Sequence, residues 1–292
     1  MKDYVVRGTD KSGNFRFFGS ITKDTVQTAA TYHETSPVVT AALGRTMTAA
    51  AMMSQMLKND RDRLSITIKG DGPIGGVIIE ANVQGNIKGY PYNPNVDIPL
   101  KENGKLDVSA AFGNAVMTVM KDFGLKEPYI GQTILVSGEI AEDFTYYFAT
   151  SEQTPSAVAL GVLVDVDYSV KQSAGFIIQV LPNADDDAIS MLEERLKDFP
   201  SLTTQLEEGK TIEDIIESLL DDVTFWEKKE IQFCCDCSVD QMERGLMSIG
   251  EKDLAELIEE DKQAELTCHF CNQHYLFEEE QLQSLLDEVQ GK

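Results

Sequence analysis

The hydrophobic positions in the first two thirds of the chain alternate in short stretches, a pattern that is typical of strands. Residues 3–9 and 14–21 are predicted to form two strands around a turn at Lys11, Ser12 and Gly13. Further strands are predicted over residues 64–68, 77–81, 86–90, 115–120, 132–136, 157–164 and 175–180.

Two segments of the same region have helical patterns. Ser36 is suited to an N-cap and Pro37 to the first helical position, so a helix is predicted from there to about Lys58. This helix carries four methionines, which suit binding of varied apolar partners. Burial in a core is the favoured interpretation, since the helix is apolar on nearly every side. With a second helix over 140–148, these elements predict an α+β core domain over residues 1–182.

Beyond residue 182 the pattern changes to acidic amphipathic helices. One apolar stripe consists of Ile189, Leu192, Leu196 and Phe199. A second helix is predicted from Thr211, with Asp214 in a capping-box arrangement, through Val223. The stripes are narrow and the segment is highly charged, so the helices are expected to be marginal without a surface to pack on. Residues 183–230 are therefore predicted to form a helical linker.

Residues 231–292 are predicted to form a small separate module. One helix begins at Ser238 with Gln241 as its capping partner. Two others carry apolar residues at helical spacing, the first Leu254, Leu257 and Ile258, the second Leu282, Leu285, Leu286 and Val289. All five cysteines of the chain fall in this part of the sequence.

The net charge of −24 is distributed unevenly along the chain. Residues 185–292 hold 30 acidic and 9 basic residues, a net charge of −21. Such a surface repels phosphates, so nucleic acid and anionic membranes are not expected as partners. No apolar run is long enough to cross a bilayer, and the first residues lack a signal-peptide pattern. We expect a cytoplasmic protein.

The cysteines lie within 38 residues, and the first 233 residues contain none. Clustering of this kind favours metal or redox chemistry over a disulfide framework. Cys235 and Cys237 form one pair and Cys268 and Cys271 a second, with 30 residues between the pairs. Because zinc takes four tetrahedral ligands and thiolates suit it, we predict one zinc ion on these four cysteines. Free buried cysteines are the alternative, but they would not explain the clustering.

Three more donors lie beside this set. Cys234 directly precedes Cys235, and His269 and His274 surround the second pair. A site with four thiolates is already closed, so all three are expected to lie outside it. Cys234 remains available for a disulfide once the metal has left.

A four-thiolate site is more often a structural staple than a switch. However, zinc contributes on the order of 10 to 16 kcal/mol to the folding of small modules, as much as the whole stability of many domains. Oxidation of the thiolates would remove this contribution, and a module of roughly 60 residues is marginal without it. Both interpretations are open on spacing alone.

Conventional catalysis finds little support in the sequence, and the protein is expected not to be an enzyme. Residues 70–75 match G-x-G-x-x-G, but a strand pattern follows where a dinucleotide site requires a helix. There is no Walker loop and no G-x-S-x-G elbow.

Taken together, these motifs resemble the redox-regulated holdase chaperones called thirty-three-kilodalton heat-shock proteins. Residues 233–237 with 268–277 look like the zinc centre of this family. Residues 138–148 and 151–153 resemble its core-domain signature, and residues 175–182 resemble the segment that closes the core.

The resemblance implies a mechanism. Reduced protein would hold zinc on Cys235, Cys237, Cys268 and Cys271 and be inactive. Oxidation would form the disulfides Cys235–Cys237 and Cys268–Cys271, expel zinc and unfold the module and linker. The exposed surface, often displayed by a homodimer in this family, would bind unfolding or oxidatively damaged client proteins without ATP. Cys234 departs from the usual four cysteines and could compete in the disulfide pairing.

Two other functions compete with this one. A thiol-disulfide oxidoreductase would use the Cys268–Cys271 pair, but it needs a low-pKa thiol at a helix N-terminus within a βαβ pattern. A zinc-ribbon adaptor for nucleic acid is disfavoured by the acidic C-terminal third.

Overall fold

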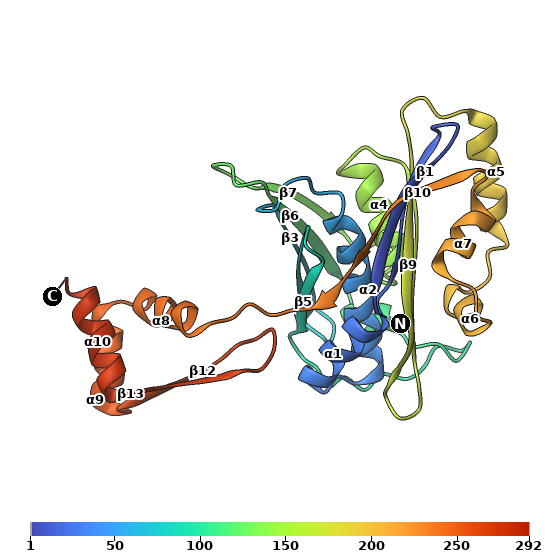
Figure 1. The fold of residues 1–292 in the computed structure, drawn as a ribbon. Helices are drawn as coiled ribbons and strands as arrows, with labels where there is room; N and C mark the ends of the chain where they lie inside the picture. The colour runs from blue at the N-terminus through green and yellow to red at the C-terminus, as the bar shows by residue number, and fades with distance from the viewer. Residues whose placement is uncertain (1, 292) are drawn as a thin grey trace. The chain divides into compact units, whose positions relative to one another are not determined.

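The computed structural model describes residues 2–291 (Figure 1). Its contacts divide the chain into two compact units, Met1–Cys234 and Cys235–Lys292. The first unit contains two mainly antiparallel sheets with helices against them, and the second is a small α+β unit with one hairpin. The predicted α+β class is therefore confirmed.

The sheets of the first unit bring together strands that are far apart in the sequence. The five-stranded sheet has the order β10-β1-β2-β9-β8 and consists of β1 (Tyr4–Asp10), β2 (Phe15–Ile21), β8 (Ser156–Val164), β9 (Val170–Val180) and β10 (Val223–Glu230). The six-stranded sheet has the order β11-β5-β4-β3-β6-β7 and consists of β3 (Arg63–Gly70), β4 (Gly76–Asn82), β5 (Asn86–Pro91), β6 (Ala115–Asp122), β7 (Tyr129–Ile134) and β11 (Gln232–Phe233). β11 pairs in parallel with β5, and the other pairings are antiparallel.

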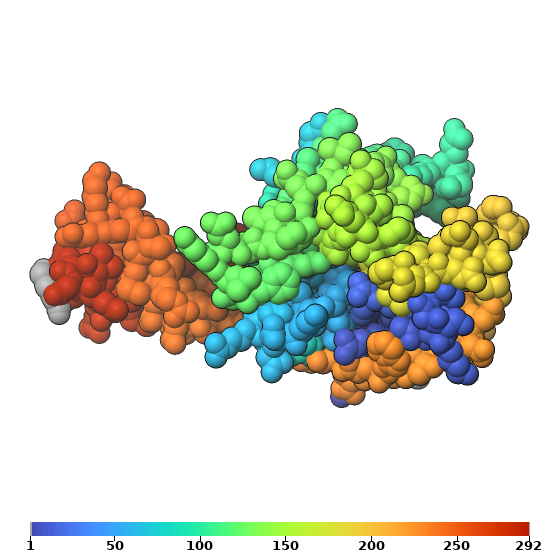
Figure 2. Space-filling model, turned by 90° about the horizontal axis from the view of Figure 1, so that it is seen from above, coloured from blue at the N-terminus to red at the C-terminus, as the bar shows by residue number. Residues whose placement is uncertain are grey.

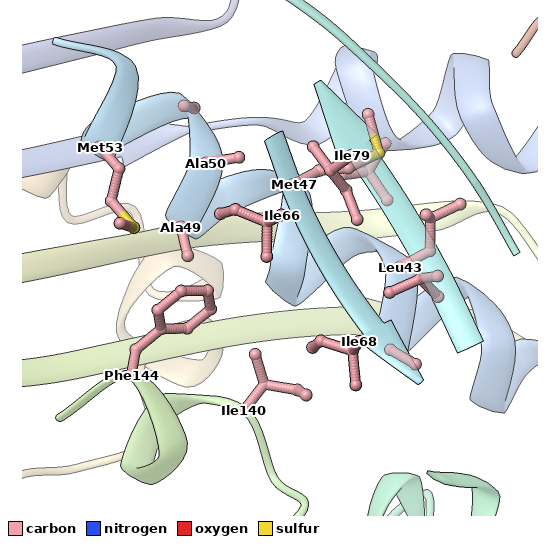
Figure 3. Close-up of a cluster of buried hydrophobic side chains, with 14 of the residues drawn as sticks. Leu43, Met47, Ala49, Ala50, Met53, Ile66, Ile68, Ile79, Ile140 and Phe144 are labelled. Carbon is pink, nitrogen blue, oxygen red and sulfur yellow. The ribbon is translucent and has the colours of Figure 1, made fainter. Parts of the chain in front are cut away.

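Helix α2 (Pro37–Ser54) lies at the centre of the main core and contacts strands of both sheets. Leu43, Met47 and Met53 point into this core together with strand residues such as Ile66 (Figure 3). The predicted burial of the methionine-rich helix is confirmed, since Met47, Met52 and Met53 are fully buried. Three further helices complete this part of the fold, α1 (Lys23–His33), α3 (Val108–Phe112) and α4 (Ala141–Thr150).

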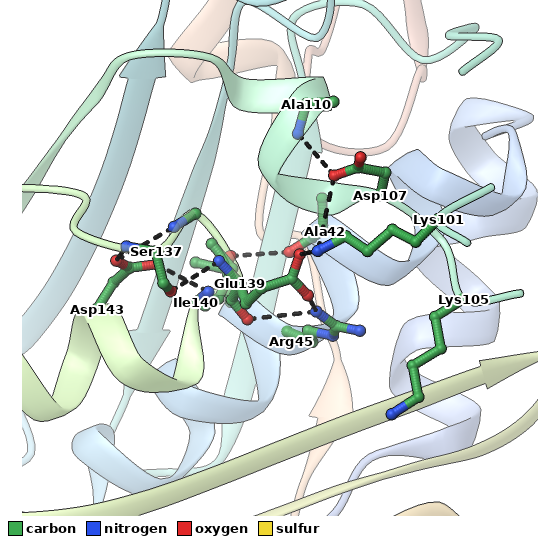
Figure 4. A network of polar contacts seen from close by, with 12 residues as sticks. Ala42, Arg45, Lys101, Lys105, Asp107, Ala110, Ser137, Glu139, Ile140 and Asp143 are labelled. Atoms are coloured by element: carbon green, nitrogen blue, oxygen red, sulfur yellow. Dashed lines mark hydrogen bonds and ion pairs between the residues drawn. The ribbon is translucent and has the colours of Figure 1, made fainter. Parts of the chain in front are cut away.

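The turn before α4 is held by one buried carboxylate (Figure 4). Asp143 accepts hydrogen bonds from the backbone N–H groups of Val136, Ser137 and Ile140, at 2.7 to 2.9 Å. Ile140 has φ of 74°, which is strained for a β-branched residue. Glu139, beside it, forms ion pairs with Arg45 of α2 and with Lys101. Side-chain contacts thus fix a turn that its backbone alone would not favour.

The acidic helices pack on the other face of the five-stranded sheet. They are α5 (Asp186–Lys197), α6 (Leu202–Glu207) and α7 (Ile212–Leu219). Their buried residues form a second core with Tyr4, Val6 and Phe17, whereas Val5 and Phe18 face the main core. The sheet is therefore buried on both faces, which supplies the surface that these narrow apolar stripes require.

The segment after α7 departs from the helical prediction. The capping box of Thr211 and Asp214 is present, but the helix ends at Leu219, and Val223 begins β10. β10 pairs with β1 from Val223 to Glu230 apart from one bulge, so long-range backbone hydrogen bonds outweigh the local helical pattern. Helices α1, α3 and α6 were not predicted, and β7 begins at Tyr129 rather than residue 132. The role of residues 183–230 as a separate linker stays a prediction.

The second unit contains the predicted helices around an unpredicted hairpin. Its elements are α8 (Val239–Ser248), α9 (Glu251–Glu260), β12 (Gln263–Thr267), β13 (His274–Glu278) and α10 (Glu279–Val289). Ser238 caps α8 by accepting a hydrogen bond from Gln241 N–H, as predicted. Eight buried residues form the core, among them Leu254, Phe277 and Leu282.

Two further features bear on alternative functions. The glycine-rich residues 70–75 form the turn of the β3–β4 hairpin, and no helix follows them, which agrees with the argument against a dinucleotide site. Within residues 2–291, every helix is too short or too polar to cross a membrane.

Candidate metal centre

Two separate segments of the second unit supply the thiols of the candidate site. Cys235 and Cys237 lie in the extended segment before α8, and Cys268 and Cys271 lie in the turn between β12 and β13. This turn is closed by backbone hydrogen bonds from Cys268 N–H to Gln273 and from Asn272 N–H to Cys268. Asn272 has φ of 56°, a conformation that asparagine tolerates better than most residues. The turn thereby fixes where the second pair of thiols lies.

The four sulfur atoms all lie within 4.8 Å of one another. The Sγ atoms of Cys235 and Cys268 are 3.6 Å apart, and those of Cys237 and Cys271 are 3.5 Å apart. Tetrahedral zinc with bonds of about 2.3 Å would place sulfurs about 3.8 Å apart. The donor set therefore fits a single four-coordinate ion, and the four cysteines could hold a metal.

A tyrosine supports this set from β13. The Tyr275 hydroxyl donates a hydrogen bond to Cys237 Sγ at 3.1 Å. Burial alone would raise the pKa of Cys237, but hydrogen bonds from Tyr275 and the neighbouring thiols hold it below its usual value. The same hydrogen bond raises the pKa of Tyr275 to about 12, so the hydroxyl keeps its proton as a donor. Sequence reasoning assigned no role to Tyr275, because only the hairpin places it beside a cysteine 38 residues away.

Burial raises the pKa of Cys235 well above its usual range and that of Cys271 to about 11. These two groups would therefore carry protons at pH 7 unless a cation stabilised their thiolate forms. A divalent metal supplies that stabilisation and offsets the repulsion among four negative sulfurs. Cys268 is buried and the other three ligands are half-buried, so small oxidants can reach part of the site.

The three additional donors lie outside the group of four. Cys234 ends the first unit, where its backbone N–H donates to the Ile87 carbonyl at 2.9 Å. His274 is exposed on β13, and its Nδ1 lies 2.6 Å from a Glu265 carboxylate oxygen. His269 is likewise not part of the cluster.

Comparison with known proteins identifies the family. The family model for the Hsp33 protein matches residues 3–278. The chain belongs to the Hsp33 family. The resemblance inferred from the cysteine motifs and the core signature is thereby confirmed, as is the chaperone class.

Relatives in the Hsp33 family are similar over their whole length. The 33 kDa chaperonin of Ruminiclostridium cellulolyticum is 50% identical over 290 residues, 99% of both chains. That of Clostridioides difficile is 50% identical over 292 residues, 99% of this chain and 100% of the relative. The crystal structure of the 33 kDa chaperonin from Thermotoga maritima matches with a TM-score of 0.93 at 35% identity, covering 100% of both chains.

Membership of the Hsp33 family establishes a chaperone that binds other proteins, and the cysteine cluster establishes a set that could hold a metal. The identity of the metal and the two disulfides stay predictions. The sulfur distances of 3.6 and 3.5 Å join Cys235 with Cys268 and Cys237 with Cys271, across the two pairs. With all four sulfurs within 4.8 Å, small rotations would also bring Cys235 to Cys237 or Cys268 to Cys271.

Proposed function

We propose that this Hsp33 protein is a redox-regulated, ATP-independent holdase. In its reduced state, one zinc ion is bound by Cys235, Cys237, Cys268 and Cys271, and the protein is inactive. Oxidation releases the zinc, and the protein then binds unfolding or oxidatively damaged clients and prevents their aggregation. The convergence of four sulfurs in a unit with only eight buried core residues supports this proposal most directly.

The energetic argument follows from the size of the second unit. A domain of roughly 60 residues buries too little surface to be robust by itself. Bound zinc contributes on the order of 10 to 16 kcal/mol, against about 5 to 15 kcal/mol for the stability of a typical domain. Loss of the metal would therefore unfold the unit.

The redox step needs only the four thiolates, hydrogen peroxide and protons from water. Each pair, Cys235 with Cys237 and Cys268 with Cys271, forms one disulfide and gives up two electrons. One hydrogen peroxide molecule accepts these two electrons together with two protons from the solvent and becomes two water molecules. Disulfide sulfurs no longer act as thiolate ligands, so the metal is released.

The acidic helices connect this event to client binding. α5, α6 and α7 cover the apolar residues of β1, β2 and β9, and the chain continues from them through β10 to Cys235. If unfolding spreads back along this connection, the covered sheet face becomes available to clients.

We further propose that the protein acts in the cytoplasm as a homodimer when active. Nucleic acid and membranes are not among its partners, given the acidic C-terminal third.

A thiol-disulfide oxidoreductase is the alternative. Cys237 directly precedes the N-cap of α8 and has a lowered pKa, two properties of attacking thiols. Against this, Cys268 and Cys271 lie between antiparallel strands rather than at a helix N-terminus. Insulin reduction separates the two functions, because only the oxidoreductase turns over catalytically.

The proposal is tested by treating the purified full chain with hydrogen peroxide at mildly elevated temperature. Zinc release, far-UV circular dichroism and suppression of the thermal aggregation of citrate synthase are followed in parallel. All three are expected to change together and to reverse with dithiothreitol. Zinc release with no gain in aggregation suppression would show that the metal site has a structural role only.

A further inference from the structure

The two sheets of the first unit end in edge strands of different character. β10 carries Glu227, Lys228, Lys229 and Glu230 and is interrupted by a bulge opposite Arg7 and Gly8. β11 is only two residues long, and β8 is uncharged but is half-buried with α4 and α6 packed against it. Charges, bulges and short length are the usual ways of preventing further strands from adding to an edge. β7, by contrast, is six residues long, and residues 129–136 contain no charge.

The backbone of β7 is open on its outer side. Leu135 N–H donates to the Ala115 carbonyl, so the backbone of Leu135 points towards β6. In an antiparallel ladder the backbone N–H groups of successive residues point alternately towards and away from the neighbouring strand. The N–H groups of Ile130, Gln132 and Ile134 therefore point away from β6. Within residues 2–291, no hydrogen bond from these three N–H groups is present. They form a row of unpaired donors at strand spacing.

Exposed apolar side chains surround this edge. Eight of the twenty large apolar residues exposed in the described chain lie between residues 116 and 136. On the outer sheet face, Val116 lies opposite Ile134 and Met120 opposite Ile130. Ile130 and Ile134 are 59% and 61% exposed. Figure 2 shows the β6–β7 hairpin, in green, at the surface of the first unit.

We propose that β7 is a docking edge on which an extended, uncharged apolar segment of a client adds as a further strand. This inference rests on the holdase function proposed above and names the surface that recognises the client. Backbone hydrogen bonds to the three open N–H groups give affinity for any extended chain, and alternate side chains lie over the apolar row. The lack of charge on β7 suits apolar segments better than charged ones.

A second copy of this chain fits the edge less well. A stable interface buries about 1,000 Å² or more in total, and pairing of two six-residue strands falls well short of that. Two chains with a net charge of −24 each also repel one another at low salt, and only an interface larger than a pair of β7 strands, such as that of the proposed homodimer, would offset this repulsion. A short, transient contact with an unfolded segment needs neither a large buried area nor the approach of two strongly negative chains.

Binding at this edge does not require oxidation. β7 is open in a structure in which all five cysteines are free thiols. Binding of isolated peptides is therefore expected in the reduced state, too weakly to prevent aggregation, and only exposure of the sheet face under the acidic helices after oxidation would add the affinity that holding a client requires.

The decisive variant is Gln132→Pro. Proline removes one open N–H and places its ring on the outer side, while the β6 ladder loses nothing because Gln132 N–H points away from it. Gln132→Ala is the matched control, since it removes the same side chain and keeps the N–H. The probe is a fluorescein-labelled seven-residue peptide of alternating valine and threonine, and its anisotropy is measured with reduced, zinc-loaded full-length protein.

The wild-type chain and Gln132→Ala are expected to bind with affinities within about twofold, and Gln132→Pro about tenfold more weakly. A peptide methylated on alternate backbone nitrogens is expected to lose binding to the wild-type chain, which tests backbone pairing even if the proline variant misfolds. Far-UV circular dichroism and the melting temperature establish whether it folds.

Equal binding of the methylated peptide would overturn the proposal, as would equal binding by folded Gln132→Pro. Sedimentation gives a second decisive result. A wild-type dimer that Gln132→Pro dissociates would assign the edge to a second copy.

The aggregation assay separates this inference from the holdase proposal. If the oxidised wild-type chain protects citrate synthase and the oxidised Gln132→Pro protects it equally, the edge is not the client surface although the holdase function stands. Failure of the oxidised wild-type chain to protect would instead contradict the holdase function.

Discussion

At the scale of single residues, Cys268 and Cys234 should behave oppositely although both are cysteines of the same cluster in sequence. Cys268 is the buried member of the four converging thiols, and Cys234 lies outside them. Cys268→Ser is expected to abolish tight zinc binding and unfold the second unit. With three ligands left, the fold loses most of the roughly 10 kcal/mol of free energy that bound zinc contributes. Cys234→Ser should retain one zinc per chain. Metal analysis and circular dichroism check both, and loss of zinc in Cys234→Ser would contradict the assigned ligand set.

Glu139 gives a residue-scale prediction about pH. Its burial would raise the pKa, but hydrogen bonds from Lys101 and Arg45 hold the pKa below its usual value. A lowered folded-state pKa stabilises the fold above the unfolded-state pKa, and this stabilisation is lost as pH falls through the folded-state value. Glu139→Gln should therefore cost roughly 1 kcal/mol at pH 7, after allowance for partial exposure.

The cost of Glu139→Gln should shrink as pH falls below about 4.3, the usual pKa of a glutamate. Urea titrations of the wild-type chain and the variant at pH 7, 5 and 3.5 measure the difference. A cost that is constant over this range would exclude the ion pairs as its cause.

At the scale of elements, the packing of α7 on β2 depends on a glycine. A Cβ atom on Gly19 would lie 2.6 Å from Ile216 Cδ1 and 2.8 Å from Ile212 Cγ1. Gly19→Ala should push α7 from the sheet at a cost of about 1 to 3 kcal/mol and speed hydrogen exchange in residues 202–222. It should also lower the peroxide concentration needed for activation, if release of these helices exposes the client surface.

The matched substitution is Gly245→Ala inside α8. A Cβ atom there meets no atom within 4 Å, so alanine should stabilise the helix by about 0.5 to 1 kcal/mol. Hydrogen exchange in residues 202–222 should remain that of the wild-type chain. Faster exchange in both variants would show that the effect of Gly19→Ala does not arise from the contact with α7.

At the scale of the whole molecule, charge opposes the compact state of the C-terminal third. Residues 185–292 have a net charge of −21, so at low salt the negative side chains within the acidic helices, and those within the second unit, repel one another. Since the screening length falls from about 30 Å at 0.01 M to about 10 Å at 0.1 M salt, added salt should slow opening of the acidic helices. Hydrogen exchange in residues 186–219 at 10 and 150 mM sodium chloride measures this, with residues 37–54 as the internal reference. An equal change in both segments would point to a general salt effect.

The sequence by itself determined the class of fold and most helices and strands whose hydrophobic positions are clearly periodic. It also determined the capping of α7 and α8 and the four cysteines that converge. These depend on local spacing or on residue types that have few other uses, such as clustered thiols. The segment after Leu219 was assigned wrongly because pairing with β1 is a long-range interaction that no local pattern records.

Only the tertiary structure decided the rest. It placed the acidic helices on the second face of the five-stranded sheet, Tyr275 beside Cys237, and the β7 edge in the open. Each of these depends on which distant segments become neighbours in space. Burial and backbone pairing are properties of that arrangement. The pattern along the sequence narrows the choice of possible neighbours but does not decide which of them pack or pair.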